Sequence, residues 1–185
     1  GEEIFCLKVH LILKKKLKKL LTIIAPRHID RVKNIEKLCR DFNLSSQTVN
    51  KNEIIEGEKD IIIINSFGVL PSYYKFIPSI FIGKSFLKRL EKVGGQDPIE
   101  AAKLGCRIYH GPYVYNFAEI YKLLEKNDIS KKVENFDDLA KYLASDLEEN
   151  NNKLMQPSIL MKDLSQKVLE KNMKIINKFL FNETL

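Results

Sequence analysis

The feature that most constrains the fold is a run of four isoleucines after an aspartate, DIIII at residues 60–64. An apolar run without alternation is typical of a strand buried on both faces, as in a parallel sheet. The segments LTIIAP (21–26), PSIFIG (78–83) and CRIYHG (106–111) have the same character, and a shorter strand is expected near 129–133. The pattern predicts a sheet covered by helices on both sides.

Helical periodicity appears between these strands, in segments whose apolar residues recur every three or four positions. The predicted helices cover residues 3–20, 30–42, 67–76, 98–104, 116–126 and 135–148. Strand and helix therefore alternate, which predicts an α/β fold: a Rossmann-like open parallel sheet with helices on both faces. Ligands of such sheets lie at the carboxyl ends of the strands.

A polar stretch, EENNNKLMQPS at residues 148–158, indicates a boundary. We expect residues 1–148 to form the sheet-containing domain. Residues 149–185 are expected to be a linker followed by an amphipathic helix, because apolar side chains recur at helical spacing after residue 160.

The charge balance favours anionic partners, since 31 Lys and Arg residues against 24 Asp and Glu residues leave a formal charge of +7. The three cysteines, Cys6, Cys39 and Cys106, are far apart and odd in number. This spacing argues against a disulfide framework or a zinc site and fits a reducing cytosol. No apolar run reaches the ~18–20 residues that cross a bilayer, so a membrane role is expected to be peripheral.

The loops after the predicted strands carry the residue types that bind phosphate. Pro26 and Arg27 follow the first strand, where a guanidinium can fork onto a phosphate; a surface salt bridge explains Arg27 equally well. Gly68 follows the second strand and permits close approach of a ligand to the backbone. After the third strand, Lys84 opens a cationic loop that continues to residue 92.

The segment GGQDPIE, residues 94–100, admits two interpretations. Asp97 as N-cap, Pro98 at the first helical position and Glu100 two residues later form a complete helix start without any ligand. The two preceding glycines remain unexplained by that account. They are expected to offer exposed amides to a phosphate, with the Glu100 carboxylate accepting from ribose hydroxyls. These observations favour a nucleotide pocket slightly over a helix start that binds no ligand.

Several standard motifs are absent from the sequence, namely GxGxxG, the Walker A loop, HExxH and Asp-x-Asp. We therefore expect no metal and no cofactor. The charge of a leaving group would then be met by Arg, Lys and backbone amides.

Taken together, several short motifs in the first 148 residues resemble those of one family. They are Gly1-Glu2-Glu3, Pro26-Arg27-His28, Phe67-Gly68, GGQDPIE at 94–100, and Gly111-Pro112 with Asn116-Phe117. In this order and spacing they resemble the C-terminal half of the 3-deoxy-D-manno-octulosonic acid (Kdo) transferases. These GT-B glycosyltransferases move Kdo from CMP-Kdo onto a lipid A precursor in lipopolysaccharide biosynthesis.

The resemblance implies that this domain binds the CMP moiety of the donor. The expected binding residues, with the two glycines of the local argument included, are Pro26, Arg27, Phe67, Gly68, Val69, Gly94, Gly95, Asp97, Pro98, Ile99 and Glu100. The family's catalytic carboxylate lies in the N-terminal domain. This chain alone is therefore expected to be inactive, with Arg27 serving only to stabilise the leaving group.

The resemblance also implies the remaining partners and the location. The lipid A precursor would bind through the N-terminal domain, and the enzyme would work in the cytoplasm, at the cytoplasmic face of the bacterial inner membrane, which it would contact peripherally. No nucleic acid is expected. In a GT-B protein the final helix returns to the N-terminal domain, which would explain the apolar positions after residue 160.

This chain departs from the family pattern at Asp97, where Asn is usual, at Val69, where Glu is common, and at Lys84, which replaces the second glycine of a Gly-Gly-Ser turn. Two alternatives therefore stay open. One is a GT-B domain for another nucleotide sugar. The other is a non-catalytic basic module that binds nucleic acid or acidic lipid.

Overall fold

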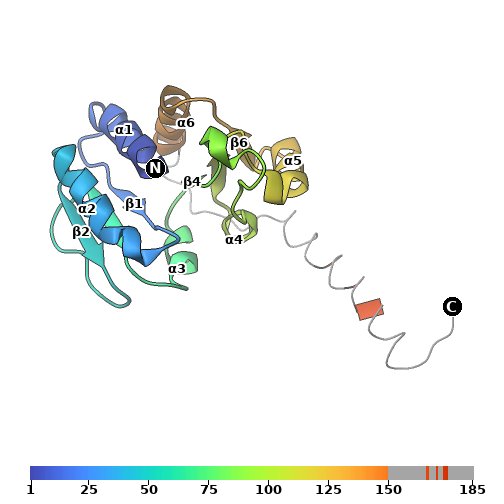
Figure 1. The fold of residues 1–185 in the computed structure, drawn as a ribbon, viewed down its shortest axis with the longest axis horizontal. Coiled ribbons are helices and arrows are strands. Elements are labelled where there is room, and N and C mark those ends of the chain that lie inside the picture. Colours follow the sequence, from blue (N-terminus) through green and yellow to red (C-terminus); the bar gives the residue numbers. More distant parts are fainter. Residues whose placement is uncertain (150–165, 167–169, 171–172, 175–185) are drawn as a thin grey trace.

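The computed structural model describes residues 1–149, 166, 170, 173 and 174, and its six strands form two parallel sheets of three strands each (Figure 1). The helices are α1 (Glu2–Lys14), α2 (Val32–Asp41), α3 (Leu70–Tyr74), α4 (Ile99–Lys103), α5 (Ala118–Lys126) and α6 (Phe136–Glu149). Strand and helix alternate as predicted except between β2 and β3, and the α/β class is confirmed. The expected linker and final helix lie outside the described residues.

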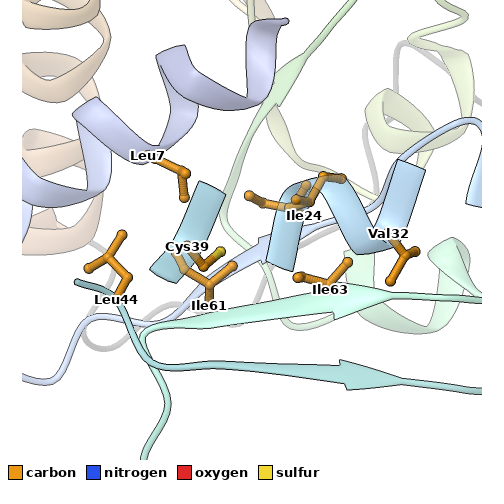
Figure 2. Close-up of a cluster of buried hydrophobic side chains, with 8 residues drawn as sticks. Leu7, Ile24, Val32, Cys39, Leu44, Ile61 and Ile63 are labelled. Atoms are coloured by element: carbon orange, nitrogen blue, oxygen red, sulfur yellow. The ribbon is translucent and has the colours of Figure 1, made fainter. Parts of the chain in front are cut away.

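The first sheet has the order β1–β3–β2, with β1 at Thr22–Ile24, β2 at Ser46–Val49 and β3 at Ile61–Ile64. All four isoleucines of β3 are buried, because α1 and α2 pack on one face of the strand and side chains of Val69 and Tyr73 pack on the other. Figure 2 shows one of these faces, where Ile61 and Ile63 point toward Leu7 of α1 and Cys39 of α2. The prediction of a doubly buried parallel strand is confirmed.

The second sheet has the order β4–β5–β6, with β4 at Ser79–Ile82, β5 at Arg107–His110 and β6 at Ser130–Lys132. Helices α4 and α5 cover one face, where their side chains pack with Ile82 and Ile108. Helices α1 and α6 pack on the other face, around Tyr109 and Leu139. Strand β6 ends this sheet and carries two exposed lysines.

The parallel strands are divided between two sheets, a division that the sequence pattern did not reveal. No hydrogen-bonded pairing joins the two sheets among the described residues. Helix α1 connects them instead, because Leu7 belongs to the core of the first sheet while Phe5, Val9 and Leu13 belong to that of the second. The α1 side chains thus hold the two halves together.

Two predicted helices are shorter than expected. The first ends at Lys14, whose ammonium pairs with Asp60 beside β3, and turns follow. Helix α3 begins only at Leu70, because Gly68 has φ +73° and interrupts helical geometry. Among the described residues no helix has the length and apolar character needed to span a bilayer.

Candidate functional site

Because all strands within each sheet are parallel, the loops that follow them emerge at its carboxyl edge. The loop after β1 reaches the long loop after β4: Arg27 Nη1 donates a hydrogen bond to Gln96 Oε1 at 2.6 Å. These residues are 69 positions apart in sequence. The structure therefore brings Pro26–Arg27 and the segment 94–100 together, as the sequence suggested.

The segment 94–100 starts a helix, as predicted. Asp97 Oδ1 accepts the Ile99 N–H at 2.8 Å, as expected of a capping side chain, although the N-cap position of α4 is Pro98 and not Asp97. Pro98 is buried, whereas Asp97 and Glu100 are exposed. No hydrogen bond of the Glu100 carboxylate is found within the described chain, so the reciprocal bond of a capping box is not formed. Its oxygens face solvent.

The two glycines of this segment do not offer free amides, contrary to expectation. Gly94 N–H donates to Leu90 O at 2.6 Å and Gly95 N–H donates to Lys84 O at 2.7 Å, and both glycines are buried. A Cβ at position 94 would lie 2.2 Å from Tyr113 O. These glycines are explained by chain crossing: the loops after β4 and β5 pass too closely for a side chain.

The loop after β3 presents Phe67 and Gly68. Phe67 is 70% exposed, and nothing lies within 4 Å of the position that a Cβ on Gly68 would take. Val69 turns inward and packs against the cluster that contains Ile64 and Tyr73. Helix α3, which follows, packs against α4. Phe67 and Gly68 therefore lie open to solvent, while Val69 is partly buried against the core.

One contact at this edge was not predicted from the sequence. The Glu2 carboxylate accepts the N–H groups of Lys84, Ser85 and Phe86, in the turn after β4. Lys84, singled out because it replaces a glycine, has φ +57°, the left-handed conformation that glycine adopts easily. The two signals, Gly1-Glu2-Glu3 and the turn at Lys84, were both visible in the sequence, but no pattern showed that they meet.

The cationic loop between residues 84 and 92 is partly neutralised. Lys88 pairs with Glu91 at 2.9 Å, and its ammonium lies 5.7 Å from the centre of the Tyr113 ring. Arg27, from the loop after β1, is a cation that donates a hydrogen bond to segment 94–100. The part of the chain that the structure describes contains no group of three His, Cys, Asp or Glu side chains able to hold a metal.

A cavity of about 720 Å³ lies away from this edge, beside β6 and between α5 and α6. Asp146 lines it and is buried, accepting hydrogen bonds from Arg107, Tyr109 Oη and Ser79 Oγ. Burial comes first among the causes that raise the pKa of Tyr109, and its hydrogen bond to Asp146 comes second. The cavity wall is thus a satisfied polar network that ties α6 to β4 and β5. None of the predicted binding residues lines this cavity.

Comparison with known proteins agrees with the motifs. No protein-family model matches the chain. The chain is 31% identical over 162 residues to the 3-deoxy-D-manno-octulosonic acid transferase of Rickettsia felis, covering 85% of this chain and 34% of that protein. It is 30% identical over 135 residues to the transferase of the same name from Aquifex aeolicus, covering 73% of this chain and 36% of the relative. The chain therefore spans about a third of the length of these relatives.

The solved structures include one close match in fold, the C-terminal CMP-Kdo binding domain of WaaA from Acinetobacter baumannii. The two structures align with a TM-score of 0.71 at 21% sequence identity, covering 82% of this chain and 77% of the other. The resemblance inferred from the motifs is confirmed: this chain is a relative of the 3-deoxy-D-manno-octulosonic acid transferases, and its fold is that of the C-terminal domain of WaaA.

Proposed function

We propose that this chain is the donor-binding part of a Kdo transferase and holds the CMP moiety of CMP-Kdo at the carboxyl edge of its sheets. The observation that carries the proposal is the hydrogen bond between Arg27 and Gln96, which gathers the loops after β1 and β4 at one place. The relatives named above support the choice of donor.

Arg27 would bind the phosphate of CMP. A guanidinium has five N–H donors, and the bond to Gln96 occupies one of its two terminal nitrogens. The remaining donors can fork onto phosphate oxygens. The exposed Glu100 carboxylate would accept from the ribose hydroxyls, and the exposed ring of Phe67 offers an aromatic face to the base. The open N–H of Gly68 would supply a further donor.

In the reaction, an acceptor hydroxyl would attack the anomeric carbon of Kdo, and the bond to the CMP oxygen would break. Negative charge then grows on the departing phosphate, where Arg27 is placed to stabilise it. We propose that the base for the acceptor hydroxyl lies in the part of the relatives that this chain does not cover. The chain alone should therefore bind CMP without transferring Kdo.

We further propose that the acceptor is a lipid A precursor, met at the cytoplasmic face of the inner membrane in the full-length protein. The lysines of residues 15–19 are exposed and lie before β1, at the amino edge of the sheet. They precede β1, whereas the Arg27 loop follows it, so we propose that they contact acidic lipid while the donor is bound.

The test is titration calorimetry of the 185-residue chain with CMP, UMP and UDP. We expect CMP to bind more tightly than UMP or UDP, and Arg27→Ala to weaken CMP by about tenfold or more, since hydrogen bonds to charged groups contribute about 1.5–3 kcal/mol. The control is Arg40→Ala, which removes the same charge at the far end of α2. Preference for UDP would favour another nucleotide sugar, and steep salt dependence without any mononucleotide preference would favour the basic-module alternative.

A further inference from the structure

We propose that Glu2 is a positioning residue for the donor site: its carboxylate fills an anion-binding nest in the turn after β4 and thereby fixes the loop that carries residues 94–100. The inference rests on the proposed function, because it names what holds that site in shape. Glu2 is not proposed to touch the donor.

The nest consists of three successive backbone N–H groups that converge on one carboxylate. Glu2 Oε1 accepts from Ser85 N at 3.0 Å and from Phe86 N at 2.6 Å, and Oε2 accepts from Lys84 N. Successive amides converge in this way when one residue adopts the left-handed conformation, as Lys84 does at φ +57°. Such a concavity binds anions, and here the anion is a side chain of the protein itself.

The residues on either side of Lys84 leave room for this carboxylate and stabilise the turn. A Cβ on Gly83 would lie 2.9 Å from Glu2 Oε2, so a larger residue would press on the carboxylate. Ser85 is buried and its hydroxyl donates to Ile82 O at 2.7 Å, which fixes the other side of the turn. The turn is therefore held by Glu2 on one side and by Ser85 on the other.

Backbone hydrogen bonds link the nest to the rest of the candidate site. Lys84 O accepts Gly95 N–H at 2.7 Å, and Ser85 O accepts Tyr113 N–H at 2.8 Å. Gly95 directly precedes Gln96, which receives the bond from Arg27. A path of direct contacts thus runs from Glu2 through the turn to Gln96 and Arg27.

Helix α1 offers a matched control in the next residue. Glu3 is also in the first turn, but its carboxylate pairs with Arg31 at 3.0 Å and does not enter the nest. Desolvation raises the pKa of Glu3, yet hydrogen bonds and neighbouring positive charge outweigh it and leave the pKa below its ordinary value. Glu3→Gln removes one negative charge from the same helix turn without changing the nest.

The experiment compares Glu2→Ala, Glu2→Gln and Glu3→Gln in the 185-residue chain, using CMP calorimetry and the amide resonances of Gly95 and Tyr113. We expect Glu2→Ala to shift both resonances and to weaken CMP binding about tenfold or more. Added acetate should enter the vacated nest and restore both readouts toward the parent. Glu2→Gln, which keeps one acceptor oxygen, should be intermediate, and Glu3→Gln should match the parent.

The outcomes separate this inference from the proposed function. Failure of the parent chain to bind CMP removes the proposed function, while the two amide resonances and their response to acetate still test the positioning role. If Glu2→Ala leaves both resonances and CMP affinity unchanged, or if acetate restores neither, the inference is overturned. Should Glu2→Ala fail to fold, Glu2→Gln decides: parent-like resonances and affinity would overturn it.

Discussion

Gln96 Oε1 accepts a hydrogen bond from Arg27 Nη1 at 2.6 Å, although the two residues lie in loops that follow strands of different sheets. Gln96 itself is anchored, because its backbone carbonyl oxygen accepts a hydrogen bond from the Tyr121 hydroxyl at 3.0 Å. The amide side chain can therefore orient the guanidinium while the other donors of Arg27 stay open.

This relationship predicts that Arg27 binds the phosphate of CMP through two parallel hydrogen bonds of its guanidinium, and not only through its charge. Arg27→Lys keeps the charge but cannot form two parallel bonds to a phosphate, so CMP should bind about tenfold more weakly. Gln96→Ala should weaken CMP only a few-fold, because the guanidinium remains but loses its orientation. Calorimetry with Arg40→Lys as control measures both effects. Equal affinity of Arg27→Lys and the parent would contradict the prediction.

Gly68 and Gly57 form a matched pair that separates backbone strain from binding. Their φ angles are +73° and +63°, and at neither would a Cβ meet any atom within 4 Å. Gly68→Ala and Gly57→Ala should each destabilise the chain by about 1–2 kcal/mol, since both force alanine into the left-handed region. CMP affinity should fall only for Gly68→Ala, because Gly57 lies before β3 and away from the carboxyl edge.

Chemical denaturation and calorimetry on the two variants provide this comparison. A loss of CMP affinity in Gly57→Ala as large as that in Gly68→Ala would mean that general destabilisation, and not the loop after β3, controls binding.

The strands that sequence alone could predict are those whose burial is complete. Every residue of β3 is buried, so its apolar run was unmistakable. Strand β2, Ser46–Val49, was missed because it is an edge strand in which only Val49 is buried, and its other positions carry polar residues. The hydrophobic pattern of a segment reflects which residues are buried, and an edge strand buries few of them.

The candidate site was predictable in its location and not in its internal bonding. The motifs at Arg27 and at residues 94–100 follow predicted strands, so the sequence placed both loops at the carboxyl ends of strands. The bond between Arg27 and Gln96 shows that the two loops meet although their strands belong to different sheets. The assignment of free amides to Gly94 was wrong because a glycine admits two explanations, close approach of a ligand or of another chain segment. The structure shows the second at that position, with Tyr113 as the neighbour. The contacts of Glu2 span more than 80 residues of sequence, and no local pattern encodes them.

Close crossing of the loops predicts that Gly111 tolerates no side chain. A Cβ there would lie 2.3 Å from Ser85 O and 2.6 Å from the Phe86 Cα, and neither atom can move independently of the backbone. Gly111→Ala should lower the free energy of unfolding by about 3 kcal/mol or more, at or above the upper end for overpacking. Denaturant melts of Gly111→Ala and Gly57→Ala check this, and the former must be the less stable of the two.

The buried histidines predict how stability depends on pH. His10 is 1% exposed, with Nδ1 at 2.9 Å from Thr22 Oγ1 and Nε2 at 3.9 Å from the Asp60 carboxylate. Desolvation lowers its pKa below the ordinary value of 6.5, against the attraction of Asp60, while Lys14 lowers it further. Desolvation likewise lowers the pKa of His110, although the Gly111 carbonyl and Glu125 oppose it.

Since both folded-state pKa values lie below that of the unfolded chain, the unfolded chain binds more protons once the pH falls below about 6.5. The stability from these neutral histidines is therefore fully present above that pH and is lost as the pH falls toward the folded-state values. Thermal melts should show a Tm that declines as the pH falls below about 6.5, at roughly 2–4 °C per kcal/mol lost. His10→Gln, which keeps a partner for Thr22 and cannot titrate, should flatten this slope. His28→Gln, at an exposed position, is the control and should leave the slope unchanged, whereas an unaltered slope in His10→Gln would assign the acid sensitivity elsewhere.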